Sequence, residues 1–341
     1  MIPAPQRTDW QIGVIGTGGI SDSHLNAYAT GGWTVAAIWN RTRATAEAKR
    51  DALAPHARLE DDWQQILADP AIDIVDITLH PEYRLPIIEA ALKAGKHVLS
   101  QKPFVTDLDT GARLVALANE MGVKLAVNQN GRFAPHFQFM RNAVRAGRIG
   151  TLSSLHARVH WDHSWTAGTP FDDLDDLLLY DFGVHWFDFV ASVAGDRVNS
   201  VFATAAHASG QANRTPLLAQ ALIRLDGGQA SLAFDGFTRH GPLDQTTITG
   251  SHGTLHSTGP DLNEQRVTLS TADGMETPTL VGQWFDDGFR GTMAELMCAI
   301  EEDREPLNGA AENLASLALT FAAIRSRQDN KEVEVGTVRT L

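Results

Sequence analysis

Over the first 131 residues, short apolar runs alternate with segments in which apolar residues recur at helical spacing. The runs are rich in β-branched residues, and we expect each of them to be a strand of a parallel sheet covered by helices. The expected strands are residues 12–15, 34–39, 72–78, 97–100 and 123–128. The expected helices are residues 19–28, 44–53, 62–67, 83–94 and 107–121. This alternation predicts a doubly wound α/β domain that binds its ligand at the carboxyl ends of the strands.

From residue 132 the pattern changes, because apolar and polar residues mostly alternate one by one, as in antiparallel strands. The expected strands are residues 153–163, 198–206, 218–225, 229–237, 245–250, 254–257 and 266–270, and the expected helices are 135–146, 184–194, 286–302 and 310–326. We therefore predict a doubly wound domain of the Rossmann type over residues 1–131. An α+β domain with a large, mostly antiparallel open sheet follows over residues 132–341, for substrate binding and oligomerisation.

A glycine turn joins the first expected strand to the first expected helix. Gly16 permits a tight turn, and Gly18 has no side chain to keep a pyrophosphate from the backbone N–H groups at the helix start. Ser21 stands where the usual dinucleotide motif has a third glycine. The turn favours a bound dinucleotide, and an ordinary strand-to-helix turn is the alternative.

The end of the second expected strand bears on the choice of cofactor. Asn40 lies where an NAD enzyme normally has the carboxylate that binds the ribose 2′-hydroxyl, and Arg41 follows it. A neutral hydrogen-bonding group beside a guanidinium suits a 2′-phosphate, so we expect NADP in preference to NAD. In the alternative interpretation, Arg41 stacks on the adenine or lies in solvent.

Composition excludes several classes of protein. The formal net charge of −13 argues against a nucleic-acid partner, and the single cysteine, Cys298, excludes an internal disulfide. The chain shows no Cys/His cluster at metal-ligand spacing, so we expect no metal. Residues 1–10 lack a signal-peptide pattern and no apolar run reaches about 20 residues, so we expect a cytoplasmic protein without a membrane partner.

Four sequence blocks carry a resemblance to a known family. They are Gly16-Thr17-Gly18, residues 94–103 (AGKHVLSQKP), residues 130–135 (NGRFAP) and residues 181–188 (DFGVHWFD). In order and spacing these blocks resemble the glucose–fructose oxidoreductase/inositol dehydrogenase (Gfo/Idh/MocA) family over nearly the whole chain. The resemblance implies that Lys102, Asp181 and His185 are catalytic. The turn and the resemblance together give the expected cofactor-binding set: Gly16, Gly18, Gly19, Ile20, Asn40, Arg41, Thr78, His80, Gln101 and Asn130.

Two positions depart from the family pattern. Gln101 stands where the family usually has a glutamate before Lys102, and this removes a carboxylate that would bind the cofactor ribose or hold the lysine. Arg84 stands where a histidine is common, at the start of a helix, and we expect it to affect packing or contacts at the edge of the cofactor.

The chemistry of alcohol oxidation fits the three expected catalytic residues. A hydride leaves the carbon while the hydroxyl loses a proton, so a base and a stabiliser of the forming alkoxide must reach one oxygen. His185 can accept the proton, Asp181 four residues earlier can orient its ring, and Lys102 supplies a cation. Taken alone, Asp181 and His185 would more simply be an exposed ion pair at a helix start.

A cluster of aromatic and polar residues at 160–165 suggests the substrate. The indoles of Trp161 and Trp165 beside His163 suit a sugar ring, whose C–H faces stack while its hydroxyls need partners. Packing at a seam between domains is the alternative. His160 and His163 would point to opposite faces of a strand, which argues against a metal.

We therefore expect an NAD(P)-dependent oxidoreductase that acts on a secondary alcohol of a sugar, sugar acid or cyclic polyol. Two alternatives stay open: a glycosidase that oxidises and restores its sugar with tightly held NAD, and a non-catalytic NAD(P)-binding regulator. Helices gathered on one side of the second sheet would leave its other face uncovered, and the resemblance implies that a second subunit covers it, so we expect a homodimer or homotetramer.

Overall fold

The computed structural model describes residues 2–341, which divide into two compact units. The first contains residues 2–134 and Trp284–Leu314, and the second contains Pro135–Gln283 and Ala315–Leu341. The first boundary lies close to the expected one at residue 131. The second unit is not continuous in sequence, however, because residues 284–314 pack with the first unit.

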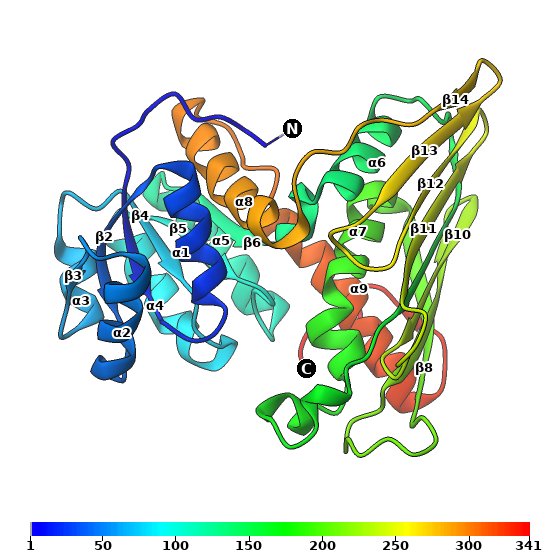
Figure 1. Ribbon diagram of the computed structural model, residues 1–341, viewed down its shortest axis with the longest axis horizontal. Coiled ribbons are helices and arrows are strands. Elements are labelled where there is room, and N and C mark those ends of the chain that lie inside the picture. The colour runs from blue at the N-terminus through cyan, green and yellow to red at the C-terminus, as the bar shows by residue number, and fades with distance from the viewer. Residues whose placement is uncertain (1) are drawn as a thin grey trace. The chain divides into compact units, whose positions relative to one another are not determined.

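The first unit is built on a six-stranded parallel sheet in the order β3-β2-β1-β4-β5-β6 (Figure 1). The strands are β1 (Gln11–Ile15), β2 (Thr34–Trp39), β3 (Arg58–Leu59), β4 (Ile74–Ile77), β5 (His97–Gln101) and β6 (Leu125–Asn128). The helices between them are α1 (Ser21–Gly31), α2 (Arg43–Leu53), α3 (Trp63–Ala68), α4 (Pro81–Lys93) and α5 (Leu108–Met121). The order reverses between β1 and β4, so ligands are expected at the carboxyl ends of these two strands.

Helix α8 (Trp284–Glu301) belongs to the first unit although it lies far along the chain. Its buried residues Phe289, Met293 and Leu296 share one apolar cluster with Leu25 and Tyr28 of α1. Figure 1 shows this orange helix beside the blue α1. Sequence alone assigned α8 to the second domain, because periodicity shows that a helix has an apolar face but not which partner covers that face.

The second unit is built on a nine-stranded sheet in the order β14-β13-β12-β11-β7-β10-β9-β8-β15. The strands are β7 (Leu152–His160), β8 (Val198–Ala206), β9 (Leu218–Leu225), β10 (Gly228–Asp235), β11 (Leu243–Gly250), β12 (Gly253–Gly259), β13 (Arg266–Thr271), β14 (Gly274–Glu276) and β15 (Val333–Glu334). Neighbouring strands are antiparallel except β7 and β10. The expected mostly antiparallel sheet is confirmed.

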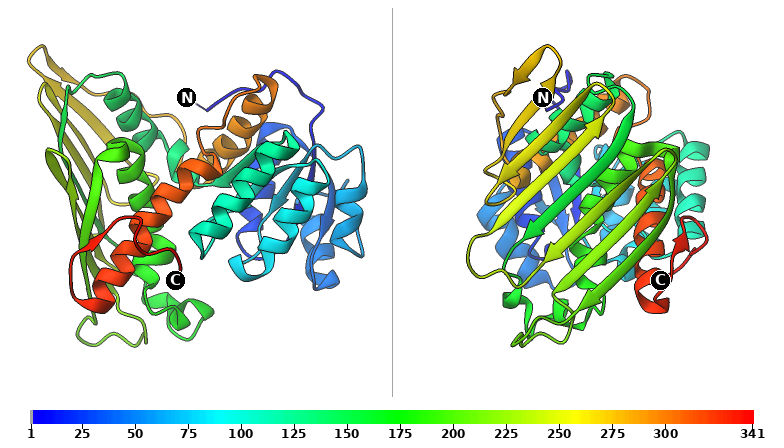
Figure 2. Two further views of the ribbon diagram at one scale, coloured as in Figure 1. Left: turned by 180° about the vertical axis from the view of Figure 1, so that it is seen from behind. Right: turned by 90° about the vertical axis from the view of Figure 1, so that its right-hand side faces the viewer.

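Helices α6 (Pro135–Arg145), α7 (Val184–Ala194) and most of α9 (Ala310–Asp329) lie on one face of this sheet (Figure 2). Within the unit, Figure 2 shows no helix over the other face. Strand β9 shows the two environments, since Ala221 and Ile223 are buried while Leu222 between them is 61% exposed. The second subunit expected on the uncovered face stays a prediction. Among residues 2–341, no helix is long and apolar enough to cross a membrane.

Candidate cofactor and substrate sites

The glycine turn after β1 has the geometry of an anion cradle. Gly16 has a φ of +106°, and a Cβ there would lie 2.8 Å from Thr78 Oγ1, so only glycine fits. A Cβ on Gly18 or Gly19 would meet no atom within 4 Å, so their backbones face open space. The buried hydroxyl of Thr17 has no hydrogen-bond partner. These features fit a bound pyrophosphate.

Neighbouring strand ends fix the shape of this turn. Thr78 Oγ1, just beyond β4, donates to Gly16 O at 2.8 Å, and Gly16 N donates to Trp39 O at 2.8 Å. Ser21, in the place of the third motif glycine, is buried and donates to Gly18 O at 2.7 Å. Ile20 precedes α1 with α-helical dihedral angles. The serine therefore replaces the glycine without opening the turn.

The residues at the end of β2 have separate tasks. The Asn40 side chain is engaged with the backbone, because its oxygen accepts from Thr17 N at 3.2 Å and its nitrogen donates to Thr42 O at 3.3 Å. Arg43 pairs with Asp61. The Arg41 guanidinium lies 5.4 Å from the ring centroid of Tyr83 and takes part in no ion pair in the described chain. Of the two arginines, Arg43 is thus held by a carboxylate and Arg41 only by its contact with an aromatic ring.

The ends of β5 and β6 join in a buried hydrogen-bond network. Gln101 Oε1 accepts from Lys102 N at 2.8 Å and from Asn128 Nδ2 at 3.0 Å. Asn128 Oδ1 in turn accepts from Thr292 Oγ1 of α8 at 2.7 Å. Because Lys102 N–H can only donate, Gln101 must present its oxygen, and Asn128 must present its amide nitrogen to Gln101.

The network continues to a carboxylate inside the sheet. Asn128 Nδ2 lies 3.1 Å from His24 Nε2, which therefore accepts, and this leaves the imidazole proton on Nδ1. His24 Nδ1 lies 2.8 Å from Asp76 Oδ2, and the Tyr28 hydroxyl donates to the same oxygen at 2.6 Å. Asp76 is fully buried, and its charge raises the pKa of Tyr28, after burial as the larger cause. Sequence reasoning missed this chain of contacts.

The other cofactor-binding residues expected in the first unit lie near strand ends. His80 is exposed at the start of α4, whereas Asn130 is buried in a short 3₁₀ turn, Asn130–Phe133, directly after β6. Lys102 is partly buried and immediately follows β5. The structure thus gathers the expected cofactor residues, with Lys102, along the carboxyl edge of one sheet.

Asp181 and His185 lie in the second unit, in consecutive helical turns. Asp181 belongs to a π-helical turn, Leu178–Phe182, and His185 is the second residue of α7. Gly183 N donates to Leu178 O at 2.8 Å, and a Cβ on Gly183 would collide with that carbonyl. The glycine of this block is therefore required by the turn that precedes α7. The wider π turn replaces the regular helical turn expected between the two residues.

The expected substrate cluster follows β7, which ends at His160 rather than at the expected residue 163. Trp161 and His163 lie with ring centroids 5.7 Å apart, and Trp186 contacts Trp161 edge to face. The buried atoms Trp161 Nε1 and His163 Nδ1 have no hydrogen-bond partner. Trp165 is 57% exposed and packs against Phe171, which lies against Phe182, and Phe182 in turn contacts His163.

Burial sets the protonation of two acidic or basic groups in this unit. Burial lowers the pKa of His163 to about 4, so its imidazole is neutral at pH 7. Asp244 on β11 is buried with both carboxylate oxygens unpartnered, and burial raises its pKa to about 7. Within residues 2–341 no group of three or more His, Cys, Asp or Glu side chains is placed to hold a metal.

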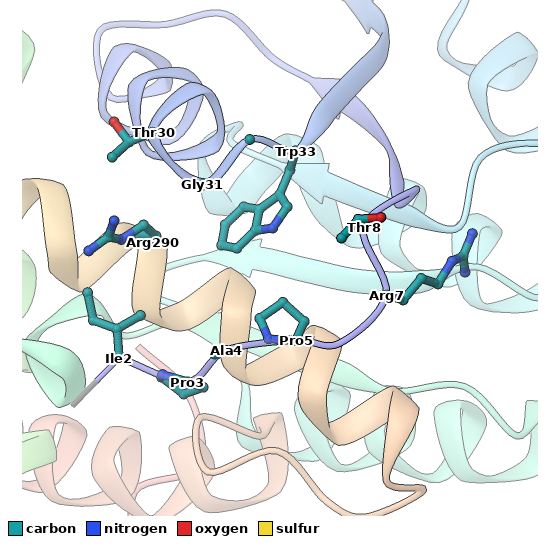
Figure 3. A pocket seen from close by; sticks show the side chains of 11 residues that line it. Ile2, Pro3, Ala4, Pro5, Arg7, Thr8, Thr30, Gly31, Trp33 and Arg290 are labelled. Carbon is teal, nitrogen blue, oxygen red and sulfur yellow. The ribbon is translucent and has the colours of Figure 1, made fainter.

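A hollow of about 390 Å³ lies in the first unit, away from the glycine turn (Figure 3). It is bordered by the segment Ile2–Pro5, the end of α1, the indole of Trp33 and Arg290 of α8. Its lining holds two arginines and no carboxylate, imidazole or thiol. Among residues 2–341, the side chains that line the hollow therefore include none that commonly transfers a proton near neutral pH.

Comparison with known proteins agrees with this geometry. Residues 10–129 match the model of an oxidoreductase family with an NAD-binding Rossmann fold (GFO_IDH_MocA), and residues 137–256 match the C-terminal domain model of the same family. The chain is 26% identical to an inositol 2-dehydrogenase of Rhizobium meliloti (strain 1021), over 95% of this chain and 99% of that protein. It is also 26% identical to a D-apiose dehydrogenase of Paraburkholderia graminis, over 94% and 88%.

A solved structure shares the whole fold. An oxidoreductase from Agrobacterium radiobacter, in complex with NAD+, L-tartaric acid and magnesium, superposes with a TM-score of 0.86 at 20% identity, over 96% of this chain and 99% of the other. The two family models together match most of residues 10–256, with one model in each unit, and the expected resemblance is confirmed. This chain belongs to the GFO/IDH/MocA family of oxidoreductases, with an NAD-binding Rossmann fold.

Proposed function

We propose that this protein oxidises a secondary alcohol of a sugar, sugar acid or cyclic polyol, or reduces the matching ketone, with a nicotinamide dinucleotide. The observation that carries this proposal is the pair of buried, unpartnered polar atoms, Trp161 Nε1 and His163 Nδ1. A buried polar group without a partner costs free energy, which a substrate hydroxyl would recover on binding. The names of the two dehydrogenase relatives support the same substrate class.

The glycine turn and the strand ends would hold the cofactor. The backbones of Gly18 and Gly19 and the free hydroxyl of Thr17 would meet the pyrophosphate. We propose NADP in preference to NAD, because Arg41 has no ion-pair partner among residues 2–341 and no carboxylate stands at the end of β2. When bound, the nicotinamide accepts the hydride from the alcohol carbon.

Three residues would manage the charge and the proton at the alcohol oxygen. The Lys102 ammonium would stabilise the negative charge that develops there, and His185 would accept the hydroxyl proton as general base. Asp181 would orient the His185 ring. In the reverse direction His185 would return the proton to the forming hydroxyl. The neutral imidazole of His163 would exchange hydrogen bonds with a substrate hydroxyl and carry no charge at neutral pH.

A substrate panel tests the proposal. The purified protein is given cyclic polyols, aldoses and sugar acids with NAD or NADP, and 2-propanol serves as the matched secondary alcohol without further hydroxyls. We expect at least one polyhydroxylated substrate to exceed 2-propanol by about 10³-fold in kcat/KM. The proposal is wrong if no substrate forms reduced cofactor. A larger kcat/KM with NAD than with NADP would overturn only the cofactor preference.

The variant Lys102→Met tests the chemistry directly. Because one preorganised charge contact contributes several kcal/mol to transition-state binding, we expect kcat to fall about 10²-fold or more while cofactor affinity changes little. Cofactor affinity is measured by the fluorescence of the bound reduced nicotinamide. A variant with nearly the original kcat would remove Lys102 from the catalytic set.

A further inference from the structure

Arg84 occupies an unusual place for a charged side chain. It is the fourth residue of α4 and is fully buried. Its two terminal nitrogens donate to two backbone carbonyls, those of Gln101 and Pro103. These carbonyls flank Lys102 on either side in the chain. A planar guanidinium presents two parallel donors at once, which an imidazole at this position would not do.

The backbone N–H of Lys102 is held from another direction. It donates to Gln101 Oε1, which is itself fixed by Asn128 and, through Asn128, by Thr292 and His24. Pro103 adds a ring that limits its own backbone rotation. The backbone on both sides of Lys102 is therefore tied to α4 by Arg84, and to β6 and α8 by the amide network.

We propose that Arg84 is a positioning residue for Lys102. A lysine side chain has four rotatable bonds, so its ammonium reaches a set point only if its backbone is fixed first. The guanidinium of Arg84 supplies that fixed base and does not contact the reacting atoms. The proposal rests on the proposed function, in which the Lys102 ammonium stabilises the alkoxide.

The first unit contains a matched control residue at the opposite end of strand β5 from Lys102. Lys96 directly precedes β5, is buried, and donates through Nζ to the carbonyls of Asp69 at 2.6 Å and Ile72 at 2.8 Å. Lys96→Met therefore also removes a buried cation from two backbone carbonyls, at the end of β5 opposite to Lys102. The comparison of Arg84→Met with Lys96→Met separates positioning from a general loss of stability.

Two measurements test the proposal. The first is the kcat and KM of the best panel substrate, with the dissociation constant of the reduced cofactor. For Arg84→Met we expect kcat to fall about 10-fold to 100-fold, with KM and cofactor affinity within about 3-fold. For Lys96→Met we expect kcat within about 3-fold of the original. Equal kcat losses in the two variants would overturn the proposal.

The second measurement, hydrogen exchange of the Lys102 amide, needs no activity. In Arg84→Met this amide should exchange about 10-fold faster relative to the amides of β1, whereas Lys96→Met should leave that ratio unchanged. Unchanged exchange in Arg84→Met would refute the backbone contact. If the panel yields no substrate, the proposed function fails, and hydrogen exchange still decides whether Arg84 holds this segment.

A second variant covers the case in which Arg84→Met does not fold. Arg84→His introduces the residue that is common in the family. A neutral imidazole has a single N–H, so it can donate to only one of the two carbonyls. We expect this variant to fold. Its Lys102 amide should exchange hydrogen faster than the same amide in Lys96→Met, and its kcat should be lower than that of the original protein. Exchange and kcat equal to those of the original protein would overturn the proposal.

Discussion

The two proposed binding regions differ in how their buried polar groups are satisfied. In the first unit, Gln101, Asn128 and His24 bond one another in an unbroken chain that ends on the Asp76 carboxylate. In the second unit, the polar atoms of Trp161 and His163 are buried beside each other without partners. A satisfied network fixes a backbone, whereas unsatisfied groups leave hydrogen-bonding capacity for a ligand.

This difference indicates that the first region would bind the cofactor and the second region would bind the substrate. The first would offer a rigid edge of backbone groups, on which a cofactor of constant shape can bind without rearrangement. The second would offer free donors and acceptors beside indole faces, a combination that selects hydroxyl-rich molecules. Variants that alter the two regions separately should therefore give distinct losses, of cofactor affinity in one case and of substrate affinity in the other.

The largest effect is expected at Gly18. In the variant Gly18→Ala the new methyl group meets no protein atom within 4 Å, so the melting temperature should stay within about 2 °C of the original. The methyl group would occupy the approach of the pyrophosphate, so the dissociation constant of the reduced cofactor should rise about 10²-fold. Calorimetry and nicotinamide fluorescence provide the two values.

Gly16→Ala is the contrasting control for the same turn. Its φ of +106° and the nearby Thr78 hydroxyl strain any larger residue, so this variant should lose about 1–2 kcal/mol of unfolding free energy or more. If Gly18→Ala destabilises the protein as much and leaves cofactor binding intact, the turn is a structural feature only.

A smaller effect is expected at Trp161. Trp161→Phe keeps an aromatic face but removes the indole N–H, so KM for the best polyol should rise about 10-fold while cofactor affinity is unchanged. Trp10→Phe makes the same chemical change at another buried indole whose nitrogen has no partner, in the first unit, and KM should not respond. An equal response in both variants would contradict a substrate contact at Trp161.

Much of this architecture could be predicted from the sequence. Strands β2, β8 and β9 have the expected bounds, because turn residues on either side of a β-branched or alternating run define where the strand begins and ends. The glycine turn was predicted for a reason that the structure repeats, since Gly16 needs a positive φ and Gly18 faces open space. Local patterns of this kind are set within a few residues of the chain.

The features that could not be predicted depend on contacts distant in sequence. A sequence signal for the buried network did exist, because Asp76 interrupts an apolar strand, but nothing local indicates that His24 and Tyr28 would meet it. The proposed role of Arg84 depends on two carbonyls, one at the end of β5 and one just beyond it, 17 and 19 residues away. The allocation of α8 to the first unit depends on the shape of the surface it covers.

The smallest effect on activity is expected at Asp244, which lies on the helix-covered face of the second sheet and is 1% exposed. Burial raises the pKa of its carboxyl from 3.8 to about 7, so between about pH 4 and pH 7 the folded state binds a proton that the unfolded state has lost. Stability from this group is complete below about pH 4, falls as the pH rises, and is lost above about pH 7.

Asp244→Asn removes this titration. The variant should therefore be more stable than the original protein at pH 8, by on the order of 4 kcal/mol, and the gain should shrink as the pH falls and vanish only below about pH 4, where both states hold the proton. Urea unfolding at pH 5, 6.5 and 8 provides the comparison. A gain that does not depend on pH would mean that Asp244 is ionised to the same extent in the folded and unfolded states. In that case its two unpartnered oxygens would have to be reached by solvent or by a bound ligand. The buried unpartnered groups that contrast with the Gln101–Asn128–His24 network would then be Trp161 Nε1 and His163 Nδ1.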